Sequence, residues 1–210
     1  MYLSSVLELL YEQIIHIDII QCIVLVFGVT EVLLARSNNI LLYPAGIIAT
    51  IFSVYSLFHV QLFAESLLNL YYFFMSVYGW WYWSRRQGQP QVKIGYASRR
   101  DWTIAVSIVF VGWGALYLVL SHFTPSDVPA WDAWISATAW AGMWLLTRRR
   151  IENWVLLNVS NAFAIPLLFQ KELHLFGVLT IFLFLVACKG YFDWIKIHRR
   201  ESTLLLSVNQ

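Results

Sequence analysis

Long apolar runs alternate with short polar stretches along almost the whole chain. A helix that crosses a bilayer needs about 20 mostly apolar residues, and seven runs approach or reach that length. They cover residues 17–35, 40–60, 62–83, 102–123, 131–146, 154–169 and 173–195. Because a segment in lipid must satisfy its own backbone hydrogen bonds, each run is predicted to be a helix. The pattern predicts an all-α integral membrane protein with seven transmembrane helices.

The amino-terminal segment, residues 1–16, follows a different pattern. Its apolar side chains recur at helical spacing, with Glu8 and Glu12 between them. This spacing is typical of an amphipathic helix that lies at the membrane surface, and we expect a short one here; an extension of the first span is the alternative. The segment has no basic start, so it is not expected to be a signal peptide.

The basic residues are distributed very unevenly between the two ends of these spans. If the amino terminus lies outside, 12 of the 14 lysines and arginines fall in the inner segments, while Lys171 lies outside and Lys189 within a span. Cytoplasmic loops of membrane proteins carry an excess of lysine and arginine. The sequence therefore predicts an outside amino terminus and a cytoplasmic carboxyl terminus.

The composition excludes several other classes of protein. The chain has 210 residues, of which 60% are hydrophobic and 12% are charged. Soluble domains carry about 25% charged residues. Cys22 and Cys188 are too far apart in sequence for a secreted disulfide scaffold, and a net charge of +2 argues against a nucleic-acid partner. With no phosphate-binding loop, catalytic triad or metal-ligand motif, we expect neither an enzyme nor a cofactor or metal site.

An internal repeat appears when the chain is aligned with itself so that Gly79 falls on Gly190. The same offset, which we call the repeat alignment, places Trp83 on Trp194 and Tyr43 on Trp154. Residues 17–83 and 131–195 each hold three spans, and the single span 102–123 between them leaves both sets running in the same direction. Parallel repeats occur in secondary transporters, with the substrate site between the halves. We therefore expect one transporter domain over residues 1–210 with a 3+1+3 arrangement.

Polar side chains inside the spans are the candidates for function, because such groups are costly in a bilayer. Two stripes at helical spacing stand out. The first stripe contains Glu65, Asn69, Tyr72 and Ser76, and the second contains Trp154, Asn158 and Asn161. All of these residues except Glu65 are taken as substrate-binding candidates. Amides offer donors and an acceptor, and aromatic faces attract cations, which suits a small, planar, polar solute. Hydrogen bonding between helices is the alternative role.

Two other charged features have simpler explanations. Lys189 and Asp193 are one helical turn apart, which predicts an ion pair near the inner face. Glu31 lies near the inner end of its span, where it is expected to contact water or Arg36. Neither feature is counted among the substrate-binding candidates.

Several segments together resemble one known family. Residues 39–86, which end in QLFAESLLNLYYFFMSVYGWWYWSRR, resemble the PnuC family of bacterial vitamin transporters, as do AWDAW, TRRRIENWVLLNVSNAFAIPLLFQKEL and the final GYFDW. The resemblance covers nearly the whole chain apart from the amino-terminal segment and the central loop. It implies a SWEET-like fold of three plus one plus three helices and a homotrimer in the bacterial inner membrane. It also implies facilitated diffusion of nicotinamide riboside, which a cytoplasmic kinase then traps.

The family pattern also bears on single residues. An amide position of the family falls on Asn69, and a Trp-x-x-Trp motif followed by asparagine falls on Trp154, Leu157 and Asn161. Leucine thus stands where the family has its second tryptophan. Nicotinamide riboside and thiamine are both cationic heteroaromatic vitamins, and both remain candidate substrates. A third hypothesis is a non-transporting membrane subunit whose polar stripes only join helices.

Overall fold

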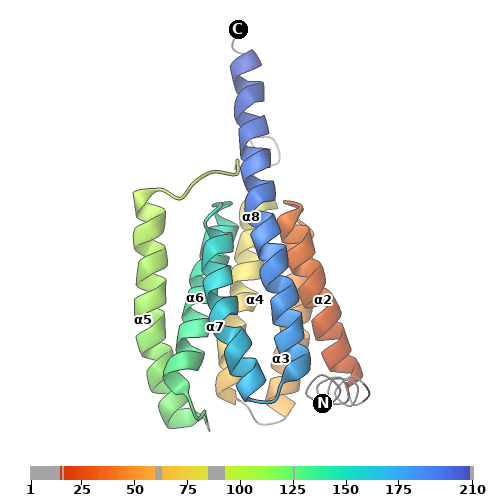
Figure 1. Ribbon diagram of the computed structural model, residues 1–210, viewed down its shortest axis with the longest axis vertical. Coiled ribbons are helices and arrows are strands. Elements are labelled where there is room, and N and C mark those ends of the chain that lie inside the picture. The colour runs from red at the N-terminus through yellow and green to blue at the C-terminus, as the bar shows by residue number, and fades with distance from the viewer. Residues whose placement is uncertain (1–14, 16, 60–62, 85–92, 125, 209–210) are drawn as a thin grey trace, which may run out of the picture.

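The computed structural model describes residues 15, 17–59, 63–84, 93–124 and 126–208, and within them the chain is almost entirely helical (Figure 1). The helices are α2 (Ile19–Arg36), α3 (Leu42–His59), α4 (Phe63–Ser84), α5 (Arg99–Phe123), α6 (Pro129–Thr147), α7 (Asn153–Gln170) and α8 (His174–Val208). The predicted all-helical fold is confirmed. The amphipathic helix predicted for residues 1–16 lies outside the described residues apart from residue 15, and it stays a prediction.

Six of the predicted spans agree with α2 to α7 to within three residues at each end. By length and composition, four of the described helices are apolar enough to cross a membrane, namely α2, α3, α5 and α8. The other three, α4, α6 and α7, contain tryptophan, tyrosine or amide side chains that lower their mean hydropathy. These features describe a multi-pass membrane protein.

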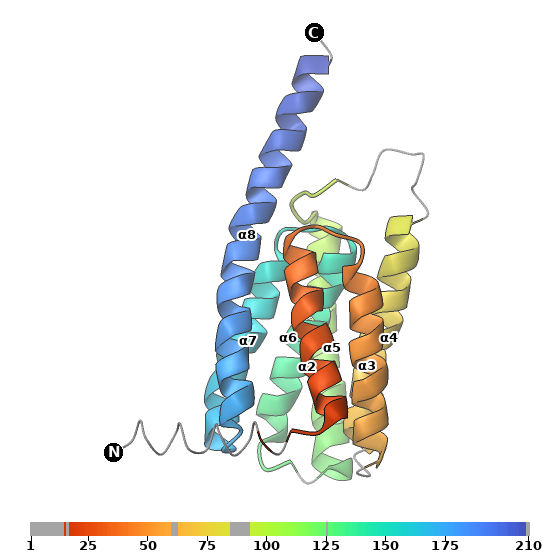
Figure 2. The ribbon, with the colours of Figure 1, turned by 90° about the vertical axis from the view of Figure 1, so that its right-hand side faces the viewer.

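The helices pack as two neighbouring bundles (Figures 1 and 2). In the first bundle α3 packs between α2 and α4, and in the second α7 packs between α6 and α8. Contacts of α2 with α8 and of α4 with α6 join the two bundles. Helix α5 stands at the edge and packs mainly on α6. The residues that end up between the bundles therefore come from helices far apart in the sequence.

In each bundle, the first helix ends in the same kind of tight turn, which leads into the second helix. Helix α2 ends with Asn38 in the left-handed region, at φ 53°, and α6 ends with Arg149 at φ 54°. In both corners the next backbone N–H bonds five residues back, from Asn39 to the Leu34 carbonyl and from Arg150 to the Leu145 carbonyl, each at 2.9 Å. This is the Schellman pattern, which satisfies helix-end carbonyls. We call the end of the molecule that holds these two turns the corner end.

The main hydrophobic core lies toward the corner end, between the two bundles. It is built around four buried aromatic side chains, Tyr43, Trp83, Trp154 and Trp194. The rings of Tyr43 and Trp83 meet edge to face at 5.1 Å between centroids, and those of Trp154 and Trp194 do so at 5.7 Å. Edge-to-face contacts are a favoured arrangement of aromatic rings. This end of the molecule is thus closed by close-packed rings.

Helix α8 is longer than the predicted span of 173–195. It continues to residue 208 and projects beyond the other helices (Figure 1). The extension packs against the segment before α5, where His198 Nδ1 lies 2.7 Å from the Ile94 carbonyl oxygen and its ring meets that of Tyr96 edge to face. Lysine and arginine are good helix formers, so a basic stretch beyond the apolar run can stay helical.

Candidate functional site

A cavity of about 420 Å³ lies between α2, α3, α4 and α8. Its walls are mostly apolar, but among the described residues four polar side chains line it: Gln21, Ser53, Ser56 and Asn69. Small-molecule sites are typically apolar clefts of about 300–1,000 Å³ with a few placed polar groups. We call this space the bundle cavity. Its lining comes from the parts of these helices farther from the corner end.

The first predicted stripe leads from this cavity toward the core. Asn69 lines the bundle cavity, and Tyr72 and Ser76 follow one and two turns later on α4. Tyr72 packs against the aromatic core. Ser76 is fully buried, and within the described residues its hydroxyl has no hydrogen-bond partner. The side chain of Glu65, the first member of the stripe, lies outside the described part.

The second predicted stripe lines a different space. Trp154 and Asn158 line a cavity of about 390 Å³ between α7 and α8, which we call the α7–α8 cavity. Asn158 donates through Nδ2 to the sulfur of Cys188 at 3.3 Å. Among the described residues, its Oδ1 and the Trp154 Nε1 have no partner. Asn161 is partly buried and lines neither cavity.

The two stripes therefore do not share one cavity in this structure. Within the described residues, they meet at the aromatic core, where Trp154 belongs to the buried cluster and Tyr72 packs against it. The six candidates remain a prediction as a common binding site. A solute that contacted both stripes would have to reach the core between the two bundles.

The ion pair predicted between Lys189 and Asp193 is wrong. Asp193 instead accepts from Arg36 across the bundles, at 2.7 Å between the carboxylate oxygen and Nε. Arg36 ends α2 beside α8, whereas the side chain of Lys189 is exposed. Glu31, which was expected to reach water or Arg36, therefore does not have Arg36 as its partner.

Glu31 lies near the bundle cavity but was not among the substrate-binding candidates predicted from the sequence. Its helix contributes Gln21, Val24 and Gly28 to the bundle cavity, and Glu31 follows at the same spacing of three or four residues. This periodicity was visible in the sequence and could have placed Glu31 on the cavity-facing side of α2. Its partner on α3 is Gly46, where an added Cβ would lie 2.5 Å from Glu31 Oε1.

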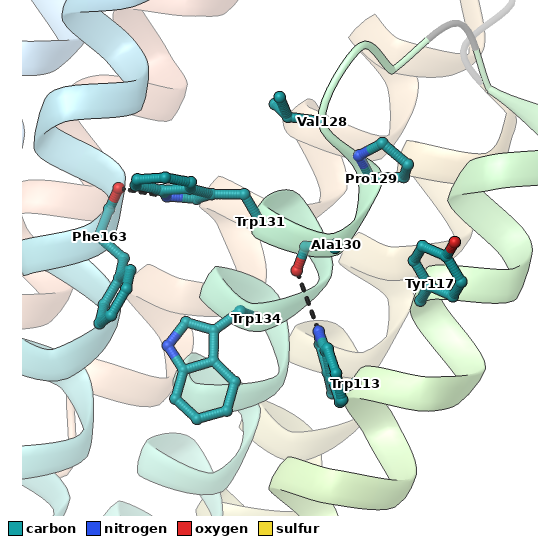
Figure 3. Close-up of a pocket in the computed structure, with 8 residues that line it drawn as sticks. All are labelled: Trp113, Tyr117, Val128, Pro129, Ala130, Trp131, Trp134 and Phe163. Atoms are coloured by element: carbon teal, nitrogen blue, oxygen red, sulfur yellow. Dashed lines mark hydrogen bonds between the residues drawn. The ribbon is translucent and has the colours of Figure 1, made fainter.

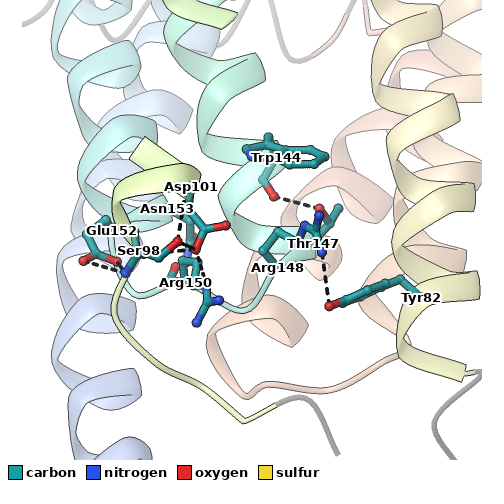
Figure 4. A network of polar contacts seen from close by, with 10 residues as sticks. Tyr82, Ser98, Asp101, Trp144, Thr147, Arg148, Arg150, Glu152 and Asn153 are labelled. Atoms are coloured by element: carbon teal, nitrogen blue, oxygen red, sulfur yellow. Dashed lines mark hydrogen bonds and ion pairs between the residues drawn. The ribbon is translucent and has the colours of Figure 1, made fainter. Parts of the chain in front are cut away.

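The corner between α6 and α7 carries a polar network (Figure 4). Arg150 pairs with Asp101 at 2.9 Å, and Glu152 accepts from the Ala97 N–H at 2.8 Å. Arg148 donates to the Tyr82 hydroxyl at 3.3 Å and thereby joins the second bundle to α4. The segment before α5 is thus fastened to the second bundle at the corner end, far from the bundle cavity.

A larger aromatic groove of about 580 Å³ lies at the opposite end, between α5, α6 and α7 (Figure 3). The Trp113 Nε1 donates to the Ala130 carbonyl at 3.0 Å, and the Trp131 Nε1 donates to the Phe163 carbonyl at 2.8 Å. Exposed tryptophans of this kind are typical of the membrane–water interface. None of the six candidates lines this groove.

Comparison with known proteins relates this architecture to vitamin transporters. The sequence matches the family described as nicotinamide mononucleotide transporter over residues 18–196. It is 25% identical to the nicotinamide riboside transporter PnuC of Escherichia coli K12 and, equally, to that of Shigella flexneri, over 90% of this chain and 90% of each relative. The crystal structure of the vitamin B3 transporter PnuC superposes with a TM-score of 0.69 at 23% identity, covering 93% of this chain and 90% of that one.

Proposed function

Because the chain belongs to the nicotinamide mononucleotide transporter family, we propose that it carries nicotinamide riboside into the cytoplasm by facilitated diffusion. The observation that carries this proposal is the bundle cavity, whose apolar walls and few polar groups lie between the two bundles. The relatives that match most of the chain are named as nicotinamide riboside transporters. A cytoplasmic kinase would then trap the vitamin by phosphorylation.

In this proposal the aromatic and the amide side chains of the two stripes bind different parts of the vitamin. Tyr72 and Trp154 stack on the pyridinium ring, which aromatic faces attract. Asn69, Asn158 and Asn161 bind the carboxamide and the ribose, and the Ser76 hydroxyl supplies a further polar contact. In support, the Ser76 hydroxyl, the Trp154 Nε1 and the Asn158 Oδ1 have no partner within the described residues. Buried polar groups are normally hydrogen-bonded, so a polar ligand would satisfy them.

The proposal includes a 3+1+3 arrangement of two parallel repeats, with α5 as the linker helix. Three pairs of matching features support it. The repeat alignment relates the two members of each pair, to within one residue. Asn38 and Arg149 occupy the same place in the two corners, and Gly79 and Gly190 pack on Tyr43 and Trp154. Trp83 and Trp194 each donate across to the first helix of the other bundle, at 3.0 Å.

The proposed setting is the bacterial inner membrane. The corner end would face the cytoplasm, because the basic residues gather there, and the amino terminus would lie outside. We also propose a homotrimer, as the resemblance implies. Helix α5 leaves large apolar side chains exposed, including Phe110, Val111 and Leu118, which suit either lipid or a second copy of the chain.

Thiamine is the second candidate substrate, and a specific residue favours keeping it. Leu157 replaces the second tryptophan of the family motif and packs against Gly142, where an added Cβ would lie 2.9 Å from its Cδ2. The site thus lacks one aromatic wall. Titration of the purified protein with both vitamins decides between them, and tighter binding of thiamine would replace nicotinamide riboside in the proposal.

Two alanine variants test the assignment of the binding residues. Asn158→Ala and Asn161→Ala should each weaken binding of nicotinamide riboside by about fivefold to a hundredfold, because a lost hydrogen bond in a dry site costs about 1–3 kcal/mol. The control is Ser107→Ala, an exposed position on α5 outside both cavities. Unchanged affinity in well-folded Asn158 and Asn161 variants would contradict the assignment.

Uptake by sealed liposomes tests the transport mechanism. Facilitated diffusion should fill the vesicles only to the outside concentration of the vitamin. Accumulation beyond that level would contradict passive transport. Binding without any flux would favour a non-transporting membrane subunit instead.

A further inference from the structure

Glu31 holds a carboxylate close to the bundle cavity, inside the membrane-spanning part of α2. It lies one turn beyond Gly28, which lines the cavity, in the direction of the aromatic core. Its carboxyl group packs against the bare backbone of Gly46 on α3, where an added Cβ would lie 2.5 Å from Oε1. The glycine therefore leaves space that the carboxylate occupies.

Within the described residues, no basic side chain forms an ion pair with this carboxylate. Arg36, the basic residue nearest in sequence, forms an ion pair with Asp193 instead. In the described part of the chain, Glu31 has neither a hydrogen bond nor an ion pair. An ionisable group in a membrane is costly and usually pairs with a partner or a substrate.

Packing alone does not require a carboxylate at this position. The repeat alignment places Glu31 on Gly142 and Gly46 on Leu157. In the second bundle the same pair of helices meets with the large and small residues exchanged, because an added Cβ on Gly142 would lie 2.9 Å from Leu157. An apolar side chain therefore fills the equivalent contact, so the charge of Glu31 has another purpose.

We propose that Glu31 is a specificity-determining residue that favours a cationic ring over a neutral one in the path between the bundles. This inference rests on the proposed function, since it assigns the charge preference of the same transport path. The pyridinium ring of nicotinamide riboside carries a positive charge, and reduction of the ring to the dihydropyridine removes that charge while leaving the carboxamide and ribose in place. The carboxylate stabilises the first form and does little for the second.

The experiment compares these two ligands by calorimetry on the purified full chain. Wild-type protein should bind the cationic riboside about tenfold or more tightly than the neutral reduced riboside, as expected for a charge pair away from bulk water. Glu31→Gln should reduce this preference to about onefold to threefold by weakening binding of the cation alone. Glu31→Asp, which keeps the charge, should retain most of the preference. Glu172→Gln is the matched control, because Glu172 is exposed and lines neither cavity.

Each contrary outcome has a distinct meaning. Equal affinity of the wild-type protein for the two ligands would overturn the role of Glu31 without any variant, even if Glu31→Gln failed to fold. A folded Glu31→Gln protein that kept the preference would also overturn it, and would leave the proposed function intact. A wild-type protein that bound neither ligand would overturn the proposed function, and this inference with it.

Discussion

At the scale of single residues, two glycines set how closely helices approach at the corner end. Gly79 packs directly on the Tyr43 ring, and Gly190 lies where an added Cβ would be 2.8 Å from the Trp154 ring. The same two rings also meet Trp83 and Trp194 edge to face. A ring confined in this way cannot move to make room for a methyl group.

Gly79→Ala and Gly190→Ala should therefore destabilise the protein by about 1–3 kcal/mol, the usual cost of overpacking a core. The measurement is the thermal unfolding midpoint in detergent. Gly114→Ala is the control, because nothing lies within 4 Å of its added Cβ, and in a helix interior alanine is about 1 kcal/mol more favourable than glycine. If all three variants melted alike, close packing at the two rings would be refuted.

These residue contacts were only partly accessible from the sequence. The repeat alignment paired Gly79 with Gly190 and Tyr43 with Trp154. It could not show that each glycine touches its own aromatic residue, because that depends on how two helices are rotated about their axes. Arg36 was a wrong partner for Glu31 for the same reason, since the distance between these two residues along the chain said nothing about Asp193 on α8.

At the scale of helices, two buried hydrogen bonds join the bundles at the corner end. Trp83 on α4 donates to the Thr147 carbonyl of α6, and Trp194 on α8 donates to the Ala35 carbonyl of α2, each at 3.0 Å. In the proposed transport, a solute that leaves through this end passes between the bundles. Both bonds would have to lengthen or break for that passage.

Trp83→Phe and Trp194→Phe should therefore favour the open form of the corner end. A neutral hydrogen bond contributes about 1 kcal/mol, so the open population and the exchange rate in liposomes should rise by about fivefold. Trp113→Phe is the control, because it loses the same kind of bond, to the Ala130 carbonyl, at the opposite end. An equal rise in that variant, or no rise in the other two, would show that these bonds do not limit opening.

The extent of the helices was largely predictable, whereas the neighbours of each helix were not. Apolar runs fix where a chain enters and leaves lipid, so α2 to α7 matched to within three residues. The α8 extension was missed because hydropathy stops at the membrane edge, while helix propensity does not. Asn69 of the first stripe lines one cavity, and Trp154 and Asn158 of the second line another, since contact between helices is set by packing across the whole bundle.

At the scale of the whole molecule, the distribution of charge predicts which end faces the cytoplasm. The corner end carries Arg36, Arg148, Arg149 and Arg150 together with the basic residues of the α8 extension, while Lys171 lies at the other end. Lysine and arginine are retained on the cytoplasmic side during insertion. The long α8 should therefore extend into the cytoplasm.

Single cysteines at the two ends test this orientation in a background that lacks Cys22 and Cys188. The two substitutions are Asp127→Cys and Ser202→Cys. Asp127 lies between α5 and α6, Ser202 lies on the α8 extension, and both side chains are exposed. A membrane-impermeant maleimide applied to spheroplasts should label the first at once and the second only after permeabilisation. The cysteine-free background controls for non-specific labelling. The reverse pattern would place the carboxyl terminus outside and would make the basic corner end an exception to the positive-inside rule. It would also turn the transport path around, so that the aromatic core closed the outer end instead of the cytoplasmic one.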